Sequence, residues 1–516
     1  MEKRLDLFAH RTEKAAAALI LLLLFLFVLF LTVRAYGETS MLTTDDPSGE
    51  KIVFYDDNVF LNIIVLIILL SAMYLFYRHC DPIRPRRMEA LLLACVFVWG
   101  TLYIATTKLR APPYSDSFLV TYGAQRAAVG DYAIVSENYF RRFPFQFGYV
   151  LYSECFFRVL YLFLHGQPEG YAVLALQEMN LLWLMVELHA LIEITGLLFK
   201  DVRIRKLLML MLFFCQPPLL TVGFLYGNTP AFACGCLAIW RFLLFVKKER
   251  LRDGVLCALF LALAVTLKLN LWIFCVAIGL VWLVTLLKKR SRLSLACLAL
   301  TALCVFTLPS LPQKLYERRV GVRYGDGIPM IAWMAMGFSE GHAGPGWYRE
   351  DYTVSAFEKS GHDREATAEN AREILAERIQ TFREDPAYAR SFFSGKLRSQ
   401  WNEPSCGSLW LNRVFPSYSE KGAMYRFICE NGARRTLALM NQYQQFALLG
   451  LLFGVIRMWR KKDILRSLLP LVLLGGLSYH LLFEAKSQYA LPYLLLMLPV
   501  SAYGFYSAFR KVELRP

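Results

Sequence analysis

The amino-acid sequence predicts an all-α polytopic membrane protein with about 12 transmembrane helices. Of its 516 residues, 56% are hydrophobic and 15% are aromatic, more than a soluble domain of this length usually carries. The apolar residues gather in runs of about 20, the length that a helix needs to cross a hydrocarbon core of about 30 Å. A net charge of +16 suggests nucleic acid as the partner of a soluble protein. Here the basic residues flank the apolar runs, so we expect the lipid bilayer as partner and no nucleic acid.

The first apolar run follows a basic start and resembles a signal peptide. The run is long, however, and no small-residue cleavage site follows it, so we expect a retained span. The predicted spans lie near residues 15–36, 58–77, 89–107, 171–198, 206–222, 230–246, 254–269, 271–287, 293–311, 440–458, 467–483 and 489–508.

The charge of the connectors indicates the topology, because cytoplasmic connectors carry an excess of Lys and Arg. Connector 38–57 is acidic and connector 223–230 is uncharged, so we place both outside. Both termini are therefore predicted to lie in the cytoplasm, with the chain in the plasma membrane. The net positive segments are 78–87, 200–206, 247–253, 288–292, 460–466 and the tail 510–516.

A long polar loop, residues 108–168, follows the third span and carries both signs of charge between aromatics and prolines. Its residues 145–165 are apolar enough to cross the membrane. Counting them as a span would place every later basic connector outside. We therefore predict a juxtamembrane helix that lies along the outer face, packed against the bundle.

A second outer segment, residues 312–439, has nearly balanced charges and dispersed aromatics, as in a mostly α extracytoplasmic domain. Residues 367–384 and 387–401 read as helices, and the Gly/Pro-rich stretch 321–347 reads as a flexible loop. Cys406 and Cys429 share this segment, which leaves a disulfide between them open. The predicted organisation is an N-terminal transmembrane hairpin 1–88, a core 89–311, the outer domain 312–439 and the last helices 440–516.

The first outer loop holds the strongest candidates for chemistry. Asp116 follows a span and Pro-Pro, where an acid can act as general base or metal ligand, or merely as a solvated acid or helix N-cap. Asp131 stands in a Gly-turn context that also suits an ordinary turn acid. Arg141 and Arg142 can hold a phosphate bidentately, or extend towards lipid headgroups.

Later segments add further candidates at the outer ends of spans. Lys268 lies at such an end, where an ionisable group faces either a cavity or the headgroups. Glu484, Lys486 and Tyr489 lie in a short outer turn, which can bring them towards the first loop or remain an ordinary charged turn. The span 171–198 contains four ionisable residues that we expect to be buried and hydrogen-bonded, Glu178, Glu187, His189 and Glu193.

Together these segments resemble the GT-C superfamily of membrane glycosyltransferases, which includes protein O-mannosyltransferases and aminoarabinose transferases. The resemblance rests on Asp116 soon after a span, the Gly-Asp stretch 127–131, the Tyr-rich entry NYFRRFPFQFGYVL (138–151) and the closing hairpin FEAKSQYALPYL (483–494). It covers roughly residues 90–311 and 440–508, so the first two spans are an addition.

The resemblance implies inverting transfer of a sugar from a polyprenyl-phosphate carrier to an acceptor hydroxyl of a glycan, lipid or protein outside the membrane. Asp116 would be the catalytic base. Arg141, Arg142, Lys268 and Lys486 would hold the leaving phosphate. Asp131, Glu484 and Tyr489 would bind substrate.

The chain also departs from the family pattern. Ser117 and Leu119 follow the first acid, Gln488 replaces an arginine before Tyr489, and Arg141 replaces a metal-binding glutamate. We therefore assign no metal ligand and leave a divalent metal ion open.

Two other classes of function also remain open. A flippase or exporter of lipid-linked glycans would need charges deep in several spans, and a polymerase or ligase would use paired arginines and a histidine in late outer loops, where only His342 and His362 occur.

Overall fold

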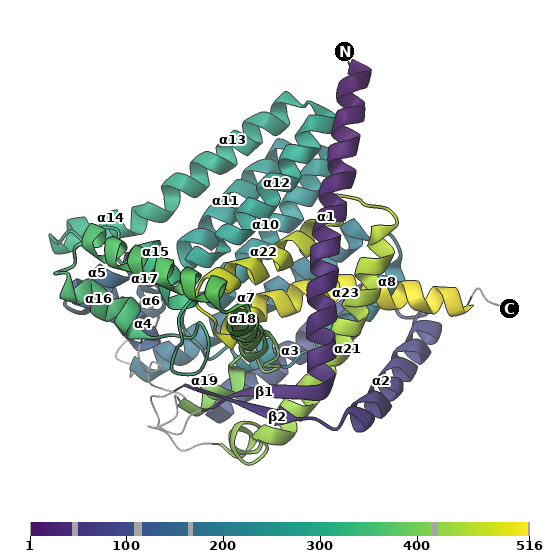
Figure 1. Ribbon diagram of the computed structural model, residues 1–516, viewed down its shortest axis with the longest axis horizontal. Helices are drawn as coiled ribbons and strands as arrows, with labels where there is room; N and C mark the ends of the chain where they lie inside the picture. Colours follow the sequence, from purple (N-terminus) through teal and green to yellow (C-terminus); the bar gives the residue numbers. More distant parts are fainter. Residues whose placement is uncertain (1, 44–49, 108–115, 164–168, 415–421, 514–516) are drawn as a thin grey trace.

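The computed structural model describes residues 2–43, 50–107, 116–163, 169–414 and 422–513. Most of this chain is helical, and the long helices α10 to α13 run side by side through the body of the molecule (Figure 1). Every predicted span overlaps a helix. These helices are α1 (Glu2–Gly37), α2 (Val59–His79), α3 (Pro85–Thr107), α7 (Glu169–Leu198), α8 (Val202–Phe214), α10 (Asn228–Lys248), α11 (Leu251–Leu267), α12 (Trp272–Lys289), α13 (Arg292–Thr307), α21 (Ala433–Trp459), α22 (Leu468–Leu482) and α23 (Leu491–Glu513).

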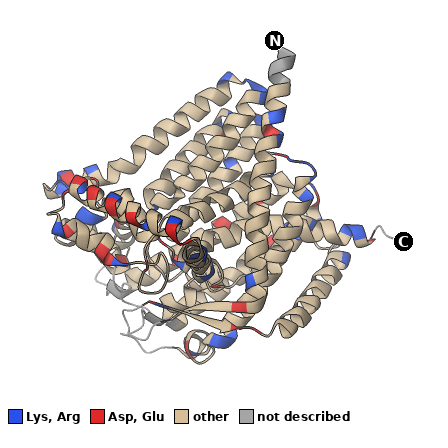
Figure 2. Cartoon of the chain, viewed as in Figure 1, with Lys and Arg blue, Asp and Glu red and all other residues tan. Residues whose placement is uncertain are grey.

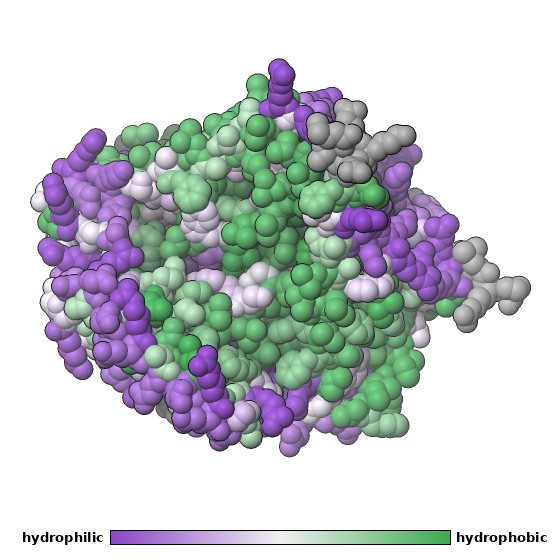
Figure 3. Space-filling view, turned by 45° about the horizontal axis from the view of Figure 1, so that its top comes forward, coloured by the Kyte–Doolittle hydropathy of each residue, from purple (hydrophilic) through white to green (hydrophobic). Residues whose placement is uncertain are grey.

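The predicted number of twelve spans is not confirmed. Within the described ranges, eight helical segments are long and apolar enough to cross a membrane, and α8, α11, α21 and α22 are not among them. Of these four, α8, α11 and α22 have only 13, 17 and 15 residues. The surface has a broad hydrophobic expanse with hydrophilic residues at either end (Figure 3). These are the features of a multi-pass membrane protein.

The shorter helices include α14 to α17, along which charged side chains concentrate at one side of the molecule (Figure 2). They are α4 (Asp116–Ala128), α5 (Asn138–Arg142), α6 (Phe147–Tyr161), α9 (Pro217–Leu220), α14 (Leu311–Val320), α15 (Met330–Gly337), α16 (Val354–Lys359), α17 (Arg364–Glu384), α18 (Pro386–Trp401), α19 (Ser408–Val414) and α20 (Ala423–Tyr425).

The apolar part of the first loop forms a helix of 15 residues, α6, shorter than a span. One buried carboxylate fixes it to α14. Glu154 accepts hydrogen bonds from Arg158 at 2.7 Å and from Arg319 at 2.9 Å, and Tyr316 also donates to it. A buried carboxylate with this many donors is strongly held, so α6 has a defined place against the bundle.

The two helices predicted in the second outer segment are confirmed as α17 and α18. Asp363 caps α17 by accepting from two backbone amides at 2.8 and 3.0 Å, and Asp385 caps α18 in the same way. Pro386 occupies the first position of α18, where its missing N–H costs nothing. Asp385 and Pro386 thus end α17 and begin α18, at the boundary that the sequence predicts.

The flexible loop predicted at 321–347 is wrong in part, because α15 forms inside it and packs against α17. Ala332, Ala335 and Met336 are buried there, so the apolar stretch outweighs the surrounding glycines. The thiols of Cys406 and Cys429, both in the described chain, do not form a disulfide. Cys429 Sγ instead lies 3.7 Å from the hydroxyl of Tyr103.

The all-α prediction also missed an antiparallel hairpin of β1 (Glu38–Thr43) and β2 (Lys51–Asp56), in which Glu38 pairs with Asp56 and Thr43 with Lys51. The hairpin is anchored on α18 and the turn after it. Arg398 forms an ion pair with Glu38, and Ser40 N donates to Asn402 O at 3.1 Å. The described residues of this acidic connector, 38–43 and 50–57, therefore pack as part of the fold.

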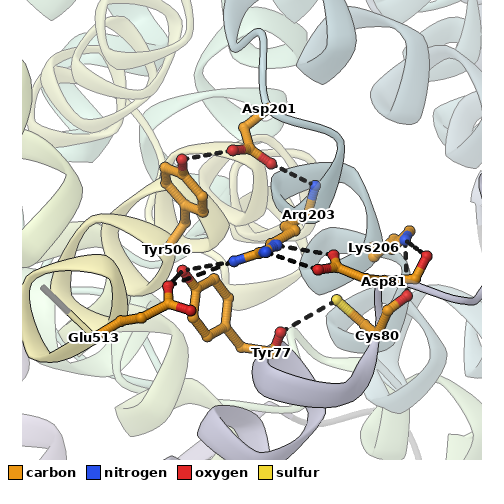
Figure 4. A network of polar contacts seen from close by, with 8 residues as sticks. All are labelled: Tyr77, Cys80, Asp81, Asp201, Arg203, Lys206, Tyr506 and Glu513. Carbon is orange, nitrogen blue, oxygen red and sulfur yellow. Dashed lines mark hydrogen bonds and ion pairs between the residues drawn. The ribbon is translucent and has the colours of Figure 1, made fainter.

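A polar network joins α2 to α8 and α23 at their charged ends (Figure 4). Arg203 binds Asp81 bidentately at 2.8 and 2.7 Å and donates to Tyr77 at 3.1 Å, and Tyr77 donates to Glu513 at 2.8 Å. Lys206 donates to the carbonyl of Cys80 at 2.7 Å. The Arg203 guanidinium also lowers the pKa of Asp81 by its hydrogen bond. We call this set of residues the Arg203 network.

Candidate functional site

Asp116 is the first residue of α4 and is partly buried beside the connector between α9 and α10. Its Oδ2 accepts a hydrogen bond from the hydroxyl of Tyr226 at 3.0 Å. The same hydroxyl accepts from Gln146 Nε2 at 2.5 Å and lies 3.4 Å from the Tyr139 hydroxyl. Burial raises the pKa of Asp116, opposed by the Tyr226 hydrogen bond and the charges of Lys486, Lys268 and Arg142. The acid is thus held in place with three cations near enough to act on it.

Lys268 directly follows α11, and its ammonium lies over the ring of Tyr226. Its Nζ is 3.5 Å from the centre of the Tyr226 ring and 3.3 Å from the Tyr226 carbonyl oxygen. Such a cation–π contact stabilises the ammonium without neutralising its charge. Burial lowers the pKa of Lys268 to about 7, although Asp116 and Glu484 act to raise it. One tyrosine therefore joins the acid and the cation.

Two glycines allow these segments to meet. Gly227 has a φ of +80°, and a Cβ there would lie 2.9 Å from the carbonyl oxygen of Leu267. A Cβ at Gly148 in α6 would lie only 1.7 Å from the carbonyl oxygen of Thr266. Since no side chain fits at either position, α6, the end of α11 and the Tyr226 connector pack backbone to backbone. This packing fixes Lys268 beside Tyr226.

The turn between α22 and α23 adds a further group of charges. Tyr489 donates a hydrogen bond to Glu484 Oε2 at 3.2 Å, and Lys486 forms an ion pair with Glu50 from the β-hairpin. Burial raises the pKa of Glu484 to about 7, with Lys486 opposing the shift. Burial lowers the pKa of Lys486, but Glu50, Glu484 and Asp116 more than offset it and raise it overall. The backbone of this turn is held by a 2.8 Å hydrogen bond from Ala485 N to Gly346 O.

Arg142, the last residue of α5, faces the same group and forms an ion pair with Glu358 of α16. Its backbone carbonyl accepts from Ile328 N at 3.2 Å, so the second outer segment packs directly on it. Its Nε is buried without a hydrogen-bond partner in the described chain. The guanidinium is therefore only partly satisfied by the protein.

The structure brings most of the predicted site residues together and leaves two aside. We define the site cluster as Asp116, Arg142, Tyr226, Lys268, Tyr348, Glu484, Lys486, Tyr489 and Glu50. Asp131 lies apart, 2.7 Å from Arg126 Nη2 and accepting from Ala133 N at 3.0 Å, as a turn acid does. Arg141 lies towards Tyr324. Burial raises the pKa of Tyr324 to about 12, and the charge of Arg141 opposes this shift.

Sequence reasoning missed three members of the site cluster. Tyr226 lies in the uncharged connector 223–230, Glu50 in the acidic connector 38–57, and Tyr348 at the end of the supposed loop. Burial raises the pKa of Tyr348, and the charges of Asp116 and Glu484 add to the shift. Nothing in the sequence of this connector singles out Tyr226, because Phe224 is a second aromatic residue there.

The electrostatics suit an anion better than a metal ion. No group of three or more His, Cys, Asp or Glu that could hold a metal ion occurs in the described parts of the chain. Asp116 and Glu484 are each accompanied by lysine, and a divalent cation would be repelled by Lys268, Lys486 and Arg142. The residues present therefore do not fit a divalent metal ion.

Next to the site cluster lies a pocket lined by residues of α7, α10 and α23. Lys268 and Tyr489 line it together with apolar residues such as Phe232 and Leu495. Apolar walls with a few polar groups are typical of a site for a small organic molecule.

Comparisons with known proteins add little to this picture. No protein family model and no curated protein matches the chain. Among solved structures, the archaeal oligosaccharyltransferase AglB from Archaeoglobus fulgidus, in complex with an inhibitory peptide and a dolichol-phosphate, superposes with a TM-score of 0.40 at 15% sequence identity. The alignment covers 82% of this chain and 51% of AglB, so this chain spans about half of that protein. No family assignment follows from these values.

Proposed function

We propose that this protein is a membrane glycosyltransferase that moves a sugar from a polyprenyl-phosphate carrier to an acceptor hydroxyl. The observation that carries the proposal is the pairing of Asp116 and Lys268 through Tyr226, next to a cavity at one end of an apolar helix bundle. Sugar transfer needs a base for the acceptor and a positive site for the leaving phosphate. The site cluster offers both within one group of contacts.

In the proposed reaction, Asp116 accepts the proton of the acceptor hydroxyl as its oxygen bonds to the anomeric carbon. The bond between that carbon and the phosphate oxygen breaks, and the electron pair leaves with the polyprenyl phosphate. Lys268, Arg142 and Lys486 stabilise the negative charge that grows on this leaving group. Attack opposite the phosphate inverts the anomeric centre. No step is assigned to Asp131 or Arg141.

Two of the three cations carry protein carboxylates in this structure. Lys486 pairs with Glu50 of the β-hairpin, and Arg142 pairs with Glu358 of α16. Both carboxylates come from segments outside the bundle. The donor phosphate replaces these carboxylates on the cations when it binds, and the displaced carboxylates lose their partners, which lowers the net affinity for the donor.

The proposal places the site on the outer face of the plasma membrane, because the basic connectors favour the cytoplasm. A lipid-linked donor suits this side, since it needs no nucleotide sugar there. The outer segment 312–439 would bind the acceptor, a glycan, lipid or protein.

The test is an assay with purified protein and a panel of polyprenyl-phosphate sugars. Free polyprenyl phosphate should be released only when an acceptor is present. Passage of the intact lipid across a proteoliposome membrane without release would contradict the proposal and favour a flippase. Growth of a lipid-linked polymer without release of the monophosphate would favour a polymerase.

A further inference from the structure

Within residues 171–198, helix α7 carries the four predicted ionisable side chains, and three of these four have partners. Thr101 donates to Glu178 Oε2 at 3.0 Å, His189 Nδ1 lies 2.5 Å from Glu89 Oε1, and Glu193 lies 3.7 Å from Arg205. Glu187 differs. The residue is 2% exposed, and its Oε1 has no hydrogen-bond partner among the described residues. Glu187 is thus buried as predicted, but its Oε1 lacks the predicted hydrogen bond within the described chain.

Glu187 lines the cavity beside the site cluster, together with Lys268 and Tyr489. Asn270 lines it too, and its Oδ1 is a second buried acceptor without a partner in the described chain. Buried acceptors in folded proteins are nearly always hydrogen-bonded, so two in one cavity point to a missing donor. Ionisable groups that face a cavity within a membrane span commonly mark a substrate site.

The cavity lining indicates the class of ligand. Leu184 and Phe232 contribute apolar walls, whereas the unpartnered oxygens of Glu187 and Asn270 require hydrogen-bond donors. A cationic ligand would meet the ammonium of Lys268 in the same cavity. A neutral ring with C–H faces and several hydroxyls suits both the apolar walls and the acceptors.

We propose that this cavity receives the sugar ring of the lipid-linked donor, with Glu187 and Asn270 accepting hydrogen bonds from its hydroxyls while Lys268 holds the phosphate. This inference rests on the proposed function and specifies which part of the donor Glu187, Asn270 and Lys268 each bind. A site built to bind hydroxyls discriminates strongly against a ligand that lacks them, because its acceptors are then left unpaired.

The test compares equilibrium binding of farnesyl phosphate with that of its glucosyl, galactosyl, mannosyl and arabinosyl derivatives to the purified full-length protein. At least one sugar should strengthen binding over bare farnesyl phosphate. Glu187→Leu should weaken that sugar-bearing lipid at least tenfold and leave bare farnesyl phosphate unchanged. The matched control is Glu178→Leu on the same helix, which should alter neither. Asn270→Ala, which removes the second acceptor, should act like Glu187→Leu and serves if the latter does not fold.

Three results would overturn the inference. The first is that no sugar adds affinity in the unaltered protein. The second is that Glu187→Leu and Asn270→Ala leave sugar-dependent binding intact. The third is that they weaken bare farnesyl phosphate equally. Failure of the proposed function looks different, since sugar-dependent binding without any turnover would contradict glycosyl transfer and still support the pocket.

Discussion

The site cluster and the Arg203 network contain similar residues but differ in how fully their charges are paired. In the Arg203 network, Arg203 binds the carboxylate of Asp81 bidentately, and Lys206 binds backbone carbonyl oxygens (Figure 4). Among the described residues, the Lys268 ammonium contacts the Tyr226 ring and carbonyl oxygen, and Asp116 is bonded to a phenol rather than to a cation. Paired charges hold helices together, whereas charges held close but left unneutralised can act on a substrate.

Asp116→Asn should have the largest effect on activity. The amide keeps the shape and can still hydrogen-bond Tyr226, but it cannot take a proton. We expect kcat to fall about 1,000-fold, as for loss of a general base, with the melting temperature nearly unchanged. The control is Asp131→Asn, at the acid paired with Arg126, which should retain most of the activity. Full activity of Asp116→Asn would remove Asp116 from the reaction.

Lys268→Met should come next, because it removes the cation at the leaving phosphate and keeps most of the side-chain volume. We expect kcat/KM to fall about 100-fold, as for loss of one group that stabilises transition-state charge. Lys268→Arg retains the charge and should recover much of the activity. Equal loss in both variants would indicate that Lys268 acts by packing alone.

The pH profile should reveal the same lysine. Its pKa is lowered to about 7, so Lys268 is charged below that pH and neutral above it. Since a phosphodiester donor keeps its charge throughout, kcat/KM should fall about tenfold per pH unit on the alkaline side. In Lys268→Arg this fall should move to higher pH. An identical alkaline limb in the two proteins would assign it to another group.

Glu50→Gln should strengthen phosphate binding, by a smaller factor than the losses of activity expected for Asp116→Asn and Lys268→Met. It removes the carboxylate that pairs with Lys486 and so frees a cation for the donor phosphate. We expect polyprenyl phosphate to bind several-fold more tightly, measured by inhibition of turnover. Weaker binding would show that Glu50 supports the site instead of competing for it.

Arg203→Ala should have the smallest effect on turnover. It tests whether the Arg203 network serves stability while the site cluster serves activity. Arg203 is partly exposed, so we expect a loss of about 1–2 kcal/mol in stability and little change in the activity of the folded protein. Arg205→Ala, which breaks a looser 3.7 Å pair with Glu193, is the control and should cost less. A large drop in activity without a drop in melting temperature would give the Arg203 network a functional role.

The sequence predicts well what is set locally. The apolar runs predict the helices, because length and hydropathy depend only on neighbouring residues. The charges of the connectors predict that Asp116, Lys268 and Lys486 lie at one end of the bundle. The structure brings these three residues together. Similarly, Asp385-Pro386 marks the boundary between α17 and α18.

What the sequence could not supply depends on contacts between distant segments. Glu178 and Glu187 look alike on one helix, and only the position of Thr101 on α3 distinguishes them. The β-hairpin is held by α18 through Arg398, far along the chain, so its acidic strand reads as a connector. Tyr226 gains its role from Asp116 on one side and Lys268 on the other.

The most direct test of the account is an experimental structure of the protein with polyprenyl phosphate bound. The account predicts the phosphate within hydrogen-bond distance of Lys268, with Arg142 and Lys486 turned towards it and Asp116 facing the phosphate across Tyr226. A phosphate bound away from these residues, with the Lys486–Glu50 and Arg142–Glu358 pairs intact, would contradict it.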